Sequence, residues 1–261
     1  MAHKTLISGT AYAVTGGREL IGGTGYSIKK GRTLIGGTGY DITFAPPYDS
    51  VFANNTWEQI IKACHNNAVP DTWNVADQKT MTINGVDYQI DIIGKNHDTY
   101  AAGGKAPLTF QLHDCYADKK AMNSLDDNSG GWKSSAMRTT HLPAILALMP
   151  TEVQNGIREV SKKASVGGAS STIETVPDKL FLLSEVEIFG SCIYSAPGEG
   201  MRYDYYWSNS VVKNRNGSAY KWWARSPDAG DYAGFCAVDR YGNEDINDAI
   251  VANGVAFGFC F

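Results

Sequence analysis

The sequence contains no long hydrophobic run, no secretion signal and no strongly one-sided charge. No stretch approaches the roughly 18 apolar residues that span a membrane, so we expect no membrane insertion. The opening residues Met1-Ala2-His3-Lys4 lack the apolar core of a signal peptide, and we therefore expect the protein to be made in the cytoplasm. The formal net charge of −4 is spread without a basic run, which argues against a nucleic-acid partner.

Paired cysteine motifs are also missing. The five cysteines are an odd number and show no Cys-x-x-Cys spacing, which argues against a disulfide framework. Free thiols, most of them buried, are the favoured interpretation, while a single bridge between Cys236 and Cys260 stays open. The cysteines are Cys64, Cys115, Cys192, Cys236 and Cys260.

Signatures of catalysis and of bound cofactors are missing as well. There is no Gly-x-Ser-x-Gly nucleophile motif, and the five histidines show neither helical i, i+4 pairs nor metal-ligand spacing with the cysteines. Gly22-Gly23-Thr24-Gly25 is not followed by the Gly-Lys-Ser/Thr of a phosphate-binding loop. His97, between Asn96 and Asp98, is interpreted as a hydrogen-bonded histidine that fixes a loop. We therefore expect no enzyme activity, no cofactor and no metal.

The chain is rich in glycine and aromatic residues, with 28 Gly, 14 Tyr and 6 Trp. This combination indicates many turns and short strands rather than a helical bundle. A hydrophobic content of 43% is typical of a globular protein, and 261 residues can form one large domain with a smaller module.

An internal repeat occupies the first 45 residues. Residues 5–12 recur as residues 19–26 and 33–40, with the leucines and the tyrosines each spaced 14 residues apart. β-forming residues around a glycine-rich centre predict short strands joined by tight turns. One unit is too small to bury its own apolar face, so residues 1–45 are predicted to attach the chain to sister subunits or to a larger particle. Residues 46–55 are predicted to be a linker.

From residue 56 onward the pattern is mixed helix and strand. Thr56 is predicted to cap a helix, and Asn84-Gly85 predicts a two-residue hairpin turn. Because strands and helices are segregated rather than alternating, the predicted class is α+β with a mainly antiparallel sheet. Further predicted elements are a strand at 107–112, a helix at about 135–149 with a kink or restart at Pro143, a short helix begun by a Thr151–Gln154 capping box, a strand at 179–183, and a helical turn from Ser184 to Gly190.

An ordered set of motifs in residues 56–261 resembles C-type-lectin-like domains of gut-bacterial and phage proteins. Their order along the chain makes the resemblance specific. It implies a C-type-lectin-like fold with two or more helices, and the N-terminal repeats resemble those that precede such domains in phage structural proteins. The motifs are Asn74-Val75-Ala76-Asp77, Ile83-Asn84-Gly85-Val86-Asp87-Tyr88, Gly94-Lys95-Asn96-His97-Asp98, Met137-Arg138-Thr139-Thr140, Asp178-Lys179-Leu180-Phe181-Leu182-Leu183-Ser184-Glu185, Asn216-Gly217-Ser218-Ala219, Trp222-Trp223-Ala224-Arg225-Ser226-Pro227 and Gly254-Val255-Ala256-Phe257-Gly258-Phe259-Cys260.

More distantly, the Leu183-Ser184-Glu185 turn and the closing strand resemble the formylglycine-generating-enzyme branch of that fold. This branch includes the variable proteins of diversity-generating retroelements, in which adenine-targeted mutagenesis rewrites a C-terminal cassette. Such mutagenesis of asparagine-type codons cannot produce Lys, Gln, Met or Trp, and none of these occurs in residues 228–253. Glu244, which such a codon cannot reach either, would be a fixed position. The resemblance thus implies a diversified display region at about 228–253.

Scaffold and display positions are predicted to separate in this C-terminal part. Arg225, after two tryptophans, is interpreted as structural, either stacked on an indole or holding a loop carboxylate. Large apolar residues should anchor the strands in the core, namely Trp222, Trp223, Phe235, Val238, Val255, Phe257 and Phe259. Between them lie tyrosines and small polar residues, a mixture typical of binding surfaces. The predicted ligand-binding residues are Asp228, Asp231, Tyr232, Ala233, Asp239, Arg240, Tyr241, Asn243, Asp245, Ile246, Asn247 and Asp248.

The resemblance implies a non-enzymatic, virion-associated receptor-binding or adhesion protein of a phage or prophage, such as a tail protein, with a cell-surface protein or glycan as ligand. Residues 1–45 would attach it to the virion or form a homo-oligomer. A structural virion decoration protein stays open, as does a formylglycine-generating-type oxidase that uses Cys236 and Cys260. Ca²⁺ binding also stays open, although the spacing misses the EF-hand loop and the Glu-Pro-Asn or Gln-Pro-Asp triplet of calcium-dependent lectins is missing. Its candidate ligands are Asp239, Asn243, Asp245, Asn247 and Asp248.

Overall fold

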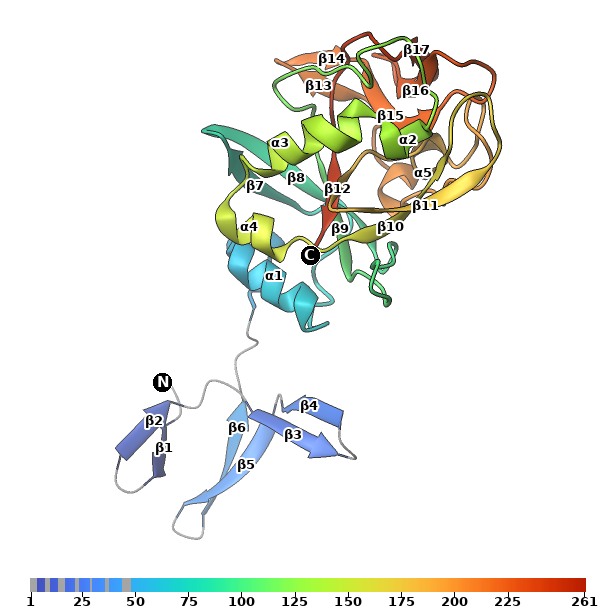
Figure 1. Cartoon of the computed structure of the whole chain (residues 1–261). Coiled ribbons are helices and arrows are strands. Elements are labelled where there is room, and N and C mark those ends of the chain that lie inside the picture. The colour runs from blue at the N-terminus through green and yellow to red at the C-terminus, as the bar shows by residue number, and fades with distance from the viewer. Residues whose placement is uncertain are drawn as a thin grey trace. The chain divides into compact units, whose positions relative to one another are not determined.

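The computed structural model describes residues 48–261 and the backbones of six strands between residues 4 and 43 (Figure 1). The chain divides into two compact units, Met1–Asp49 and Ser50–Phe261. The predicted attachment role of residues 1–45 depends on side chains that lie outside the described residues, and it stays a prediction. In the first unit the strands form three antiparallel hairpins, one for each copy of the repeat: β1 Lys4–Ile7 with β2 Thr10–Ala13, β3 Gly17–Ile21 with β4 Thr24–Ile28, and β5 Lys30–Ile35 with β6 Thr38–Thr43.

The second unit is an α+β domain with mainly antiparallel sheets, as the sequence predicts. Its largest sheet has five strands in the order β12-β18-β9-β8-β7, and every neighbouring pair is antiparallel. The C-terminal strand β18 lies between β9 and β12, so the chain ends inside the core, where Phe261 is buried. The strands are β7 Gln78–Ile83, β8 Val86–Lys95, β9 Leu108–Leu112, β12 Leu180–Phe181 and β18 Gly258–Cys260.

Side chains cap the helices α1 and α5. Thr56 accepts a hydrogen bond from the Gln59 backbone while the Gln59 side chain accepts one from Thr56, so the predicted cap of α1 is confirmed. Ser184 and Glu187 form the same box at α5, which ends at Gly190 in the left-handed conformation. The α-helices are α1 Trp57–His65, α2 Gly131–Ser134, α3 Leu142–Leu146, α4 Thr151–Gly156 and α5 Glu185–Phe189; η1 Phe52–Asn54 and η3 Asp204–Trp207 are 3-10 turns, and η2 Met137–His141 is a π-helical turn.

The helix expected at about 135–149 is present, because η2 and α3 follow each other directly from Met137 to Leu146. The restart expected near Pro143 is the change from a π-helical to an α-helical turn, and Pro143 stands in the first turn of α3. One predicted helix feature needs correction. The Thr151 capping box at α4 does not form. Pro150 is the residue before the helix, and the Gln154 side chain donates instead to the backbone oxygen of Met149, at 2.7 Å.

The second unit also begins before the predicted boundary at residue 56. Phe52, inside the predicted linker 46–55, is 2% exposed. Its ring packs edge-on against Trp57 and Trp73 and stacks on Phe110 of β9, with ring centroids 5.4–6.4 Å apart. Aromatic burial therefore extends the domain to the start of the unit at Ser50.

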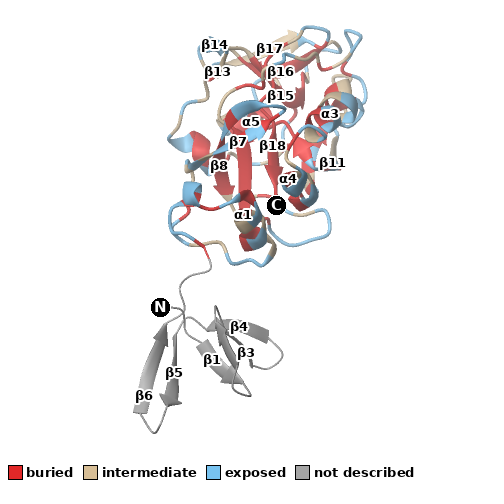
Figure 2. Ribbon diagram, turned by 90° about the vertical axis from the view of Figure 1, so that its left-hand side faces the viewer, coloured by how far each residue is buried: buried red, intermediate tan, exposed pale blue. Residues whose placement is uncertain are grey.

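A smaller three-stranded sheet, with the loops that connect its strands, contains the predicted ligand-binding residues. It has the order β15-β16-β17, formed by β15 Trp222–Pro227, β16 Gly234–Val238 and β17 Glu244–Asp248. Together with the hairpin of β13 Lys213–Arg215 and β14 Ser218–Tyr220, it lies at the end of the domain away from α1 (Figures 1 and 2). A further hairpin pairs β10 Val160–Ser165 with β11 Ile173–Asp178. Within the described residues, no helix is long and apolar enough to cross a membrane.

Candidate functional site

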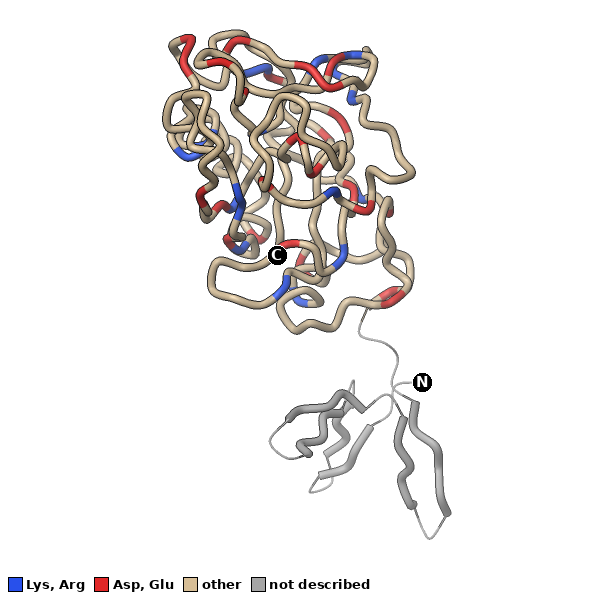
Figure 3. The backbone as a smooth tube through the Cα atoms, turned by 90° about the vertical axis from the view of Figure 1, so that its right-hand side faces the viewer, with Lys and Arg blue, Asp and Glu red and all other residues tan. Residues whose placement is uncertain are grey.

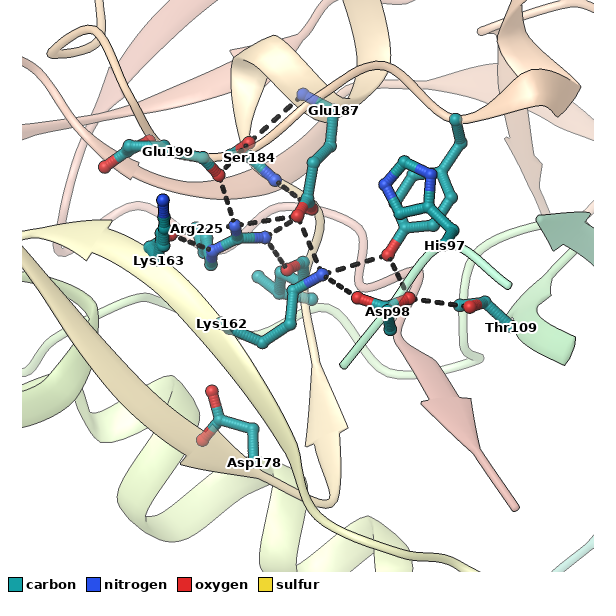
Figure 4. A network of polar contacts seen from close by, with 12 residues as sticks. His97, Asp98, Thr109, Lys162, Lys163, Asp178, Ser184, Glu187, Glu199 and Arg225 are labelled. Carbon is teal, nitrogen blue, oxygen red and sulfur yellow. Dashed lines mark hydrogen bonds and ion pairs between the residues drawn. The ribbon is translucent and has the colours of Figure 1, made fainter. Parts of the chain in front are cut away.

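Four charged side chains from different parts of the chain meet in the core (Figure 4). Lys162 of β10 places its Nζ 2.7 Å from both Asp98, which follows β8, and Glu187 of α5. Arg225 of β15 contacts the same Glu187 carboxylate through two nitrogens, at 2.5 and 3.0 Å. Tyr203 donates a further hydrogen bond to Asp98, at 2.7 Å. Two cations and two anions thus form one buried cluster without excess charge.

The pKa values of the acids show how strongly the cluster holds its charges. Burial raises the pKa of Asp98, but the charge and hydrogen bond of Lys162 outweigh it and bring the value down to about 2. Burial likewise opposes ionisation of Glu187, but Arg225 and Lys162 hold the pKa of this carboxyl below its ordinary value. The four charged groups are therefore paired with one another inside the domain, and we interpret the cluster as structural.

Arg225 has the structural role that the sequence suggested, with a different partner. It is 0% exposed and bonds a helix carboxylate, Glu187, together with the backbone oxygens of Leu182, Lys163 and Glu199. His97 lies in the loop after β8, where its ring stacks on Tyr203 at a centroid distance of 3.9 Å, and the predicted hydrogen bond of the ring stays a prediction.

Five of the predicted ligand-binding residues in the β16–β17 hairpin converge on an open hollow of about 480 Å³. They come from the turn after β16 and from one face of β17, where alternate residues point to the same side. Residues of the β14–β15 connection and of the segment before β18 complete the lining. The hollow is lined by Ala219, Tyr220, Lys221, Asp239, Arg240, Tyr241, Asp245, Asn247 and Asn253.

Asp239 fixes the shape of the turn. Its Oδ1 accepts hydrogen bonds from the backbone nitrogens of Tyr241 and Asn243, at 2.7 and 2.8 Å, and its Oδ2 accepts one from the Asn243 side chain, at 3.0 Å. Although desolvation raises it, the hydrogen bonds from Asn243 hold the pKa of Asp239 below its ordinary value. Gly242 has a φ of +90°, a conformation that favours glycine at this tight turn. Arg240 and Tyr241 are left exposed at the tip.

Polar pairs line the other side of the hollow. Lys221 Nζ lies 2.5 Å from the Asp245 carboxylate, and the Asn247 amide donates to Asn253 Oδ1 at 3.3 Å. The backbone of Asn253 is held between two hydrogen bonds with Lys120, of 3.0 and 3.1 Å. The predicted anchors Trp222 and Trp223 are 0% exposed and donate through their indole nitrogens to backbone oxygens. A rigid frame therefore carries these side chains.

Asp228 is a wrong prediction, because it is buried. It is 6% exposed, its carboxylate accepts from the backbone nitrogen of Gly230 at 2.8 Å, and its backbone pairs with Gly234 and bridges to Ser195. The amide of Asn128 donates to backbone oxygens at both ends of this loop. Asp228 therefore shapes the loop from inside instead of contacting a ligand.

The remaining predicted residues are not brought into the hollow. Asp231, Tyr232 and Ala233 precede β16 and lie at the opposite end of the hairpin from the Asp239 turn, with Tyr232 65% exposed. Ile246 and Asp248 lie on β17 but alternate with Asp245 and Asn247, so their side chains point to the other face. Asn243 bonds Asp239 in the turn but does not line the hollow. The predicted set is therefore not one surface: five of its residues line the hollow, and the others lie in the turn, on the other face of β17, at the far end of the hairpin or buried.

Sequence reasoning missed four residues of the hollow, and nonlocal pairing is the reason. Tyr220 and Lys221 precede β15, which is separated from β17 by β16, and Asn253 arrives through its bridge with Lys120. The one local signal was that Tyr220 and Lys221 directly precede the buried Trp222, so that they had to lie at the end of an anchored strand.

A second, smaller hollow of about 270 Å³ lies beside β8 and includes His113 and Cys115. His113 Nδ1 lies 2.9 Å from the fully buried Asp91, and this hydrogen bond raises the pKa of the imidazole. Burial raises the pKa of the Cys115 thiol to about 12, so it stays protonated at neutral pH. The histidine is oriented by its carboxylate partner, a feature that no sequence motif had indicated.

Thiol and metal chemistry find little support in the geometry. All five cysteines, which lie in the described part of the chain, are free, so the interpretation as free thiols is confirmed and a Cys236–Cys260 bridge is excluded. Burial raises the pKa of both thiols well above the ordinary value, the opposite of an activated cysteine. Within residues 48–261, no three His, Cys, Asp or Glu side chains are grouped closely enough to hold a metal ion.

These observations define an α+β domain whose polar hollow lies at one end of a buried, rigid frame. The family model of Domain of unknown function (DUF6273) matches residues 109–260, which run from β9 through β18 and contain every residue that lines the hollow. Because the match covers more than half of the sequence, the chain belongs to this family. No curated protein and no solved structure gives a significant match to the sequence.

Proposed function

We propose that the chain is a non-enzymatic binding protein that contacts a cell-surface ligand through the hollow and the β16–β17 turn. The observation that carries this proposal is the convergence of Asp239, Arg240, Tyr241, Asp245 and Asn247 into one hollow, together with aromatic and amide side chains from elsewhere in the chain. Concave sites with a few well-placed polar groups are the usual form of ligand sites.

The side chains at the turn have the properties of contact residues. Tyr241 is 69% exposed, and the Arg240 guanidinium lies over its ring at 4.8 Å and donates to its hydroxyl at 2.6 Å. Tyrosine and arginine are enriched among residues that dominate binding energy, because they give large contact areas at a small entropic cost. The hydrogen bonds of Asp239 hold the turn through backbone nitrogens and the Asn243 amide, without the side chains of Arg240 and Tyr241.

The proposal includes a C-type-lectin-like scaffold and a phage or prophage origin with a diversified display region. The ordered motifs of residues 56–261 support the scaffold, and the N-terminal repeats support attachment to a virion. Display in several copies would raise the avidity of a weak single site without new contacts.

The test uses the full chain, biotinylated and tetramerised on labelled streptavidin, with panels of intact Gram-positive and Gram-negative bacterial cells read by flow cytometry. We expect binding to some of these cells, and Tyr241→Ala should weaken it by about tenfold or more. Trp207→Ala is the matched control, because Trp207 is 67% exposed and is likewise stacked with an arginine, but lies outside the hollow. Both variants should keep the melting temperature of the unchanged protein.

Two results would contradict the proposal. If the unchanged protein bound no cells above background, the structural decoration alternative would take its place. If Tyr241→Ala bound as tightly as Trp207→Ala, the ligand would contact another surface of the domain.

A further inference from the structure

The charges that line the hollow compensate one another, which bears on what can bind there. Two are cationic, Lys221 and Arg240, and two are anionic, Asp239 and Asp245. Lys221 is paired with Asp245 at 2.5 Å, and the Asp239 carboxylate is occupied by donors of its own turn. Acidic and basic residues are interspersed along the backbone of the second unit (Figure 3). A cationic ligand would have to displace one of these internal partners, whereas Arg240 contacts only the ring and hydroxyl of Tyr241.

Asn253, which lines the hollow, also has a buried hydrogen-bond donor that the protein does not use. Asn253 is 5% exposed, and among the described residues its Nδ2 finds no hydrogen-bond partner, whereas its Oδ1 accepts from Asn247. Its backbone is fixed by Lys120 on both sides, so the amide cannot move far to find a partner. Buried donors are nearly always satisfied, and an acceptor oxygen of a ligand would satisfy this one.

Two tyrosines add flat apolar surface to this polar setting. Tyr241 stands exposed at the turn, while Tyr220 is half buried and has the Arg215 guanidinium over its ring at 5.4 Å. A pyranose ring combines an apolar C–H face, which can lie against an aromatic ring, with hydroxyl oxygens that both donate and accept. The volume of about 480 Å³ is within the range of roughly 300–1,000 Å³ for small-molecule sites.

We propose that the hollow binds an uncharged saccharide residue of a cell-surface glycan without a bridging metal ion. This inference rests on the proposed function and narrows its ligand to one class. The apolar face of the sugar lies against Tyr241, and a hydroxyl or acetamido oxygen accepts from Asn253. Asp239 and Asp245, which a metal would need as ligands, are already committed to the turn and to Lys221.

The experiment applies the full chain, in buffer containing EDTA, to an array of neutral oligosaccharides and of sialylated or uronic-acid oligosaccharides. We expect binding to neutral members, confirmed by calorimetric titration with N-acetylglucosamine, galactose and glucose. Tyr241→Ala and Asn253→Asp should each weaken the affinity by about tenfold or more, the second because it replaces the free donor by an acceptor of the same shape. Tyr232→Ala, an equally exposed tyrosine at the far end of the hairpin, should leave it unchanged.

Each other outcome overturns the inference in a distinguishable way. Binding to acidic glycans alone would refute the uncharged ligand, and loss of binding in EDTA would refute the metal-free site. Cell binding that depends on Tyr241, survives periodate oxidation of the cells and disappears after proteinase K would indicate a protein ligand, which refutes this inference and leaves the proposed function standing. Absence of cell binding would refute both.

Discussion

Replacing Arg225 by methionine tests whether the buried ion cluster holds the frame of the domain. Methionine keeps an apolar stem that reaches about as far as Nε but removes the charge and every side-chain hydrogen bond. Glu187 would lose two contacts, of 2.5 and 3.0 Å, and three backbone oxygens would each lose a donor, although Ser184 still donates to that of Glu199. Removing one partner of a buried ion pair costs about 3–5 kcal/mol. Because Lys162 stays 2.7 Å from Glu187, we expect a loss of about 3 kcal/mol, at the lower end of this range.

Urea unfolding followed by tryptophan fluorescence measures this loss. All six tryptophans lie between residues 57 and 223, so the signal reports only on the second unit. Lys133→Met is the control, because Lys133 forms an ion pair of similar length with Glu174, at 2.8 Å, on the surface. An exposed pair of this kind contributes at most about 1 kcal/mol. The slope of the unfolding free energy against urea should be the same in both variants.

Equal losses for the two variants would refute the reasoning. A loss below about 1 kcal/mol for Arg225→Met would mean that methionine packs as well as the ion cluster, as happens in some proteins. The cluster would then not be what keeps β15 and the hollow in place.

Three further changes test other parts of the structure. Burial raises the pKa of Glu199 from 4.5 to about 7, so between these pH values the carboxyl is ionised in the unfolded chain and still protonated in the folded one. The free energy of unfolding should therefore fall as the pH rises through this interval. Glu199→Gln should flatten this slope, which urea unfolding at pH 5 and pH 8 measures. Gly85→Ala should lower the free energy of unfolding by about 1 kcal/mol, the cost of a positive φ alone, because nothing lies near its added Cβ. Gly167→Ala should lower it several times more, because the added Cβ would also lie 1.9 Å from the Asn128 carbonyl oxygen; thermal unfolding measures both. Asn128→Ala should lower the free energy of unfolding by about 2–3 kcal/mol and speed amide hydrogen exchange in residues 228–234, because the buried Asn128 amide donates to the carbonyls of Asp231 and Gly234, both at 2.8 Å.

Features that depend on a few adjacent residues were predictable from the sequence. The Thr56 cap, the Asn84-Gly85 turn and the helix from Ser184 to Gly190 each rest on contacts within about six residues, and all three form. The cap at Thr151 was predicted by the same kind of pattern and does not form. There Pro150, not Thr151, is the residue before the helix, and the Gln154 side chain donates to the Met149 carbonyl instead.

The site was predictable only where one hairpin contains it. The turn at Asp239 and the outward face of β17 follow from alternation along the chain, whereas Tyr220, Lys221 and Asn253 reach the hollow through pairing across strands. Asp228 was misplaced because a polar residue in a loop was taken to be exposed. Its loop is bonded to Asn128, 100 residues earlier in the chain, and no local pattern reports such a contact.

Some of the predicted display residues hold the β16–β17 turn in shape, and others are exposed at its tip without shaping it. This difference limits which positions of a diversified surface could vary. Asp239 and Asn243 bond each other and the backbone of their own turn, so most substitutions at these positions would change the shape of the hollow. Arg240 and Tyr241 stand at the tip of the same turn, and the contacts that fix its backbone do not use their side chains. Since the turn keeps its shape without them, they can change while the frame stays folded. The proposed diversification is therefore compatible with the fold at positions 240 and 241. A substitution at 239 or 243 that altered ligand specificity would also alter the shape of the turn.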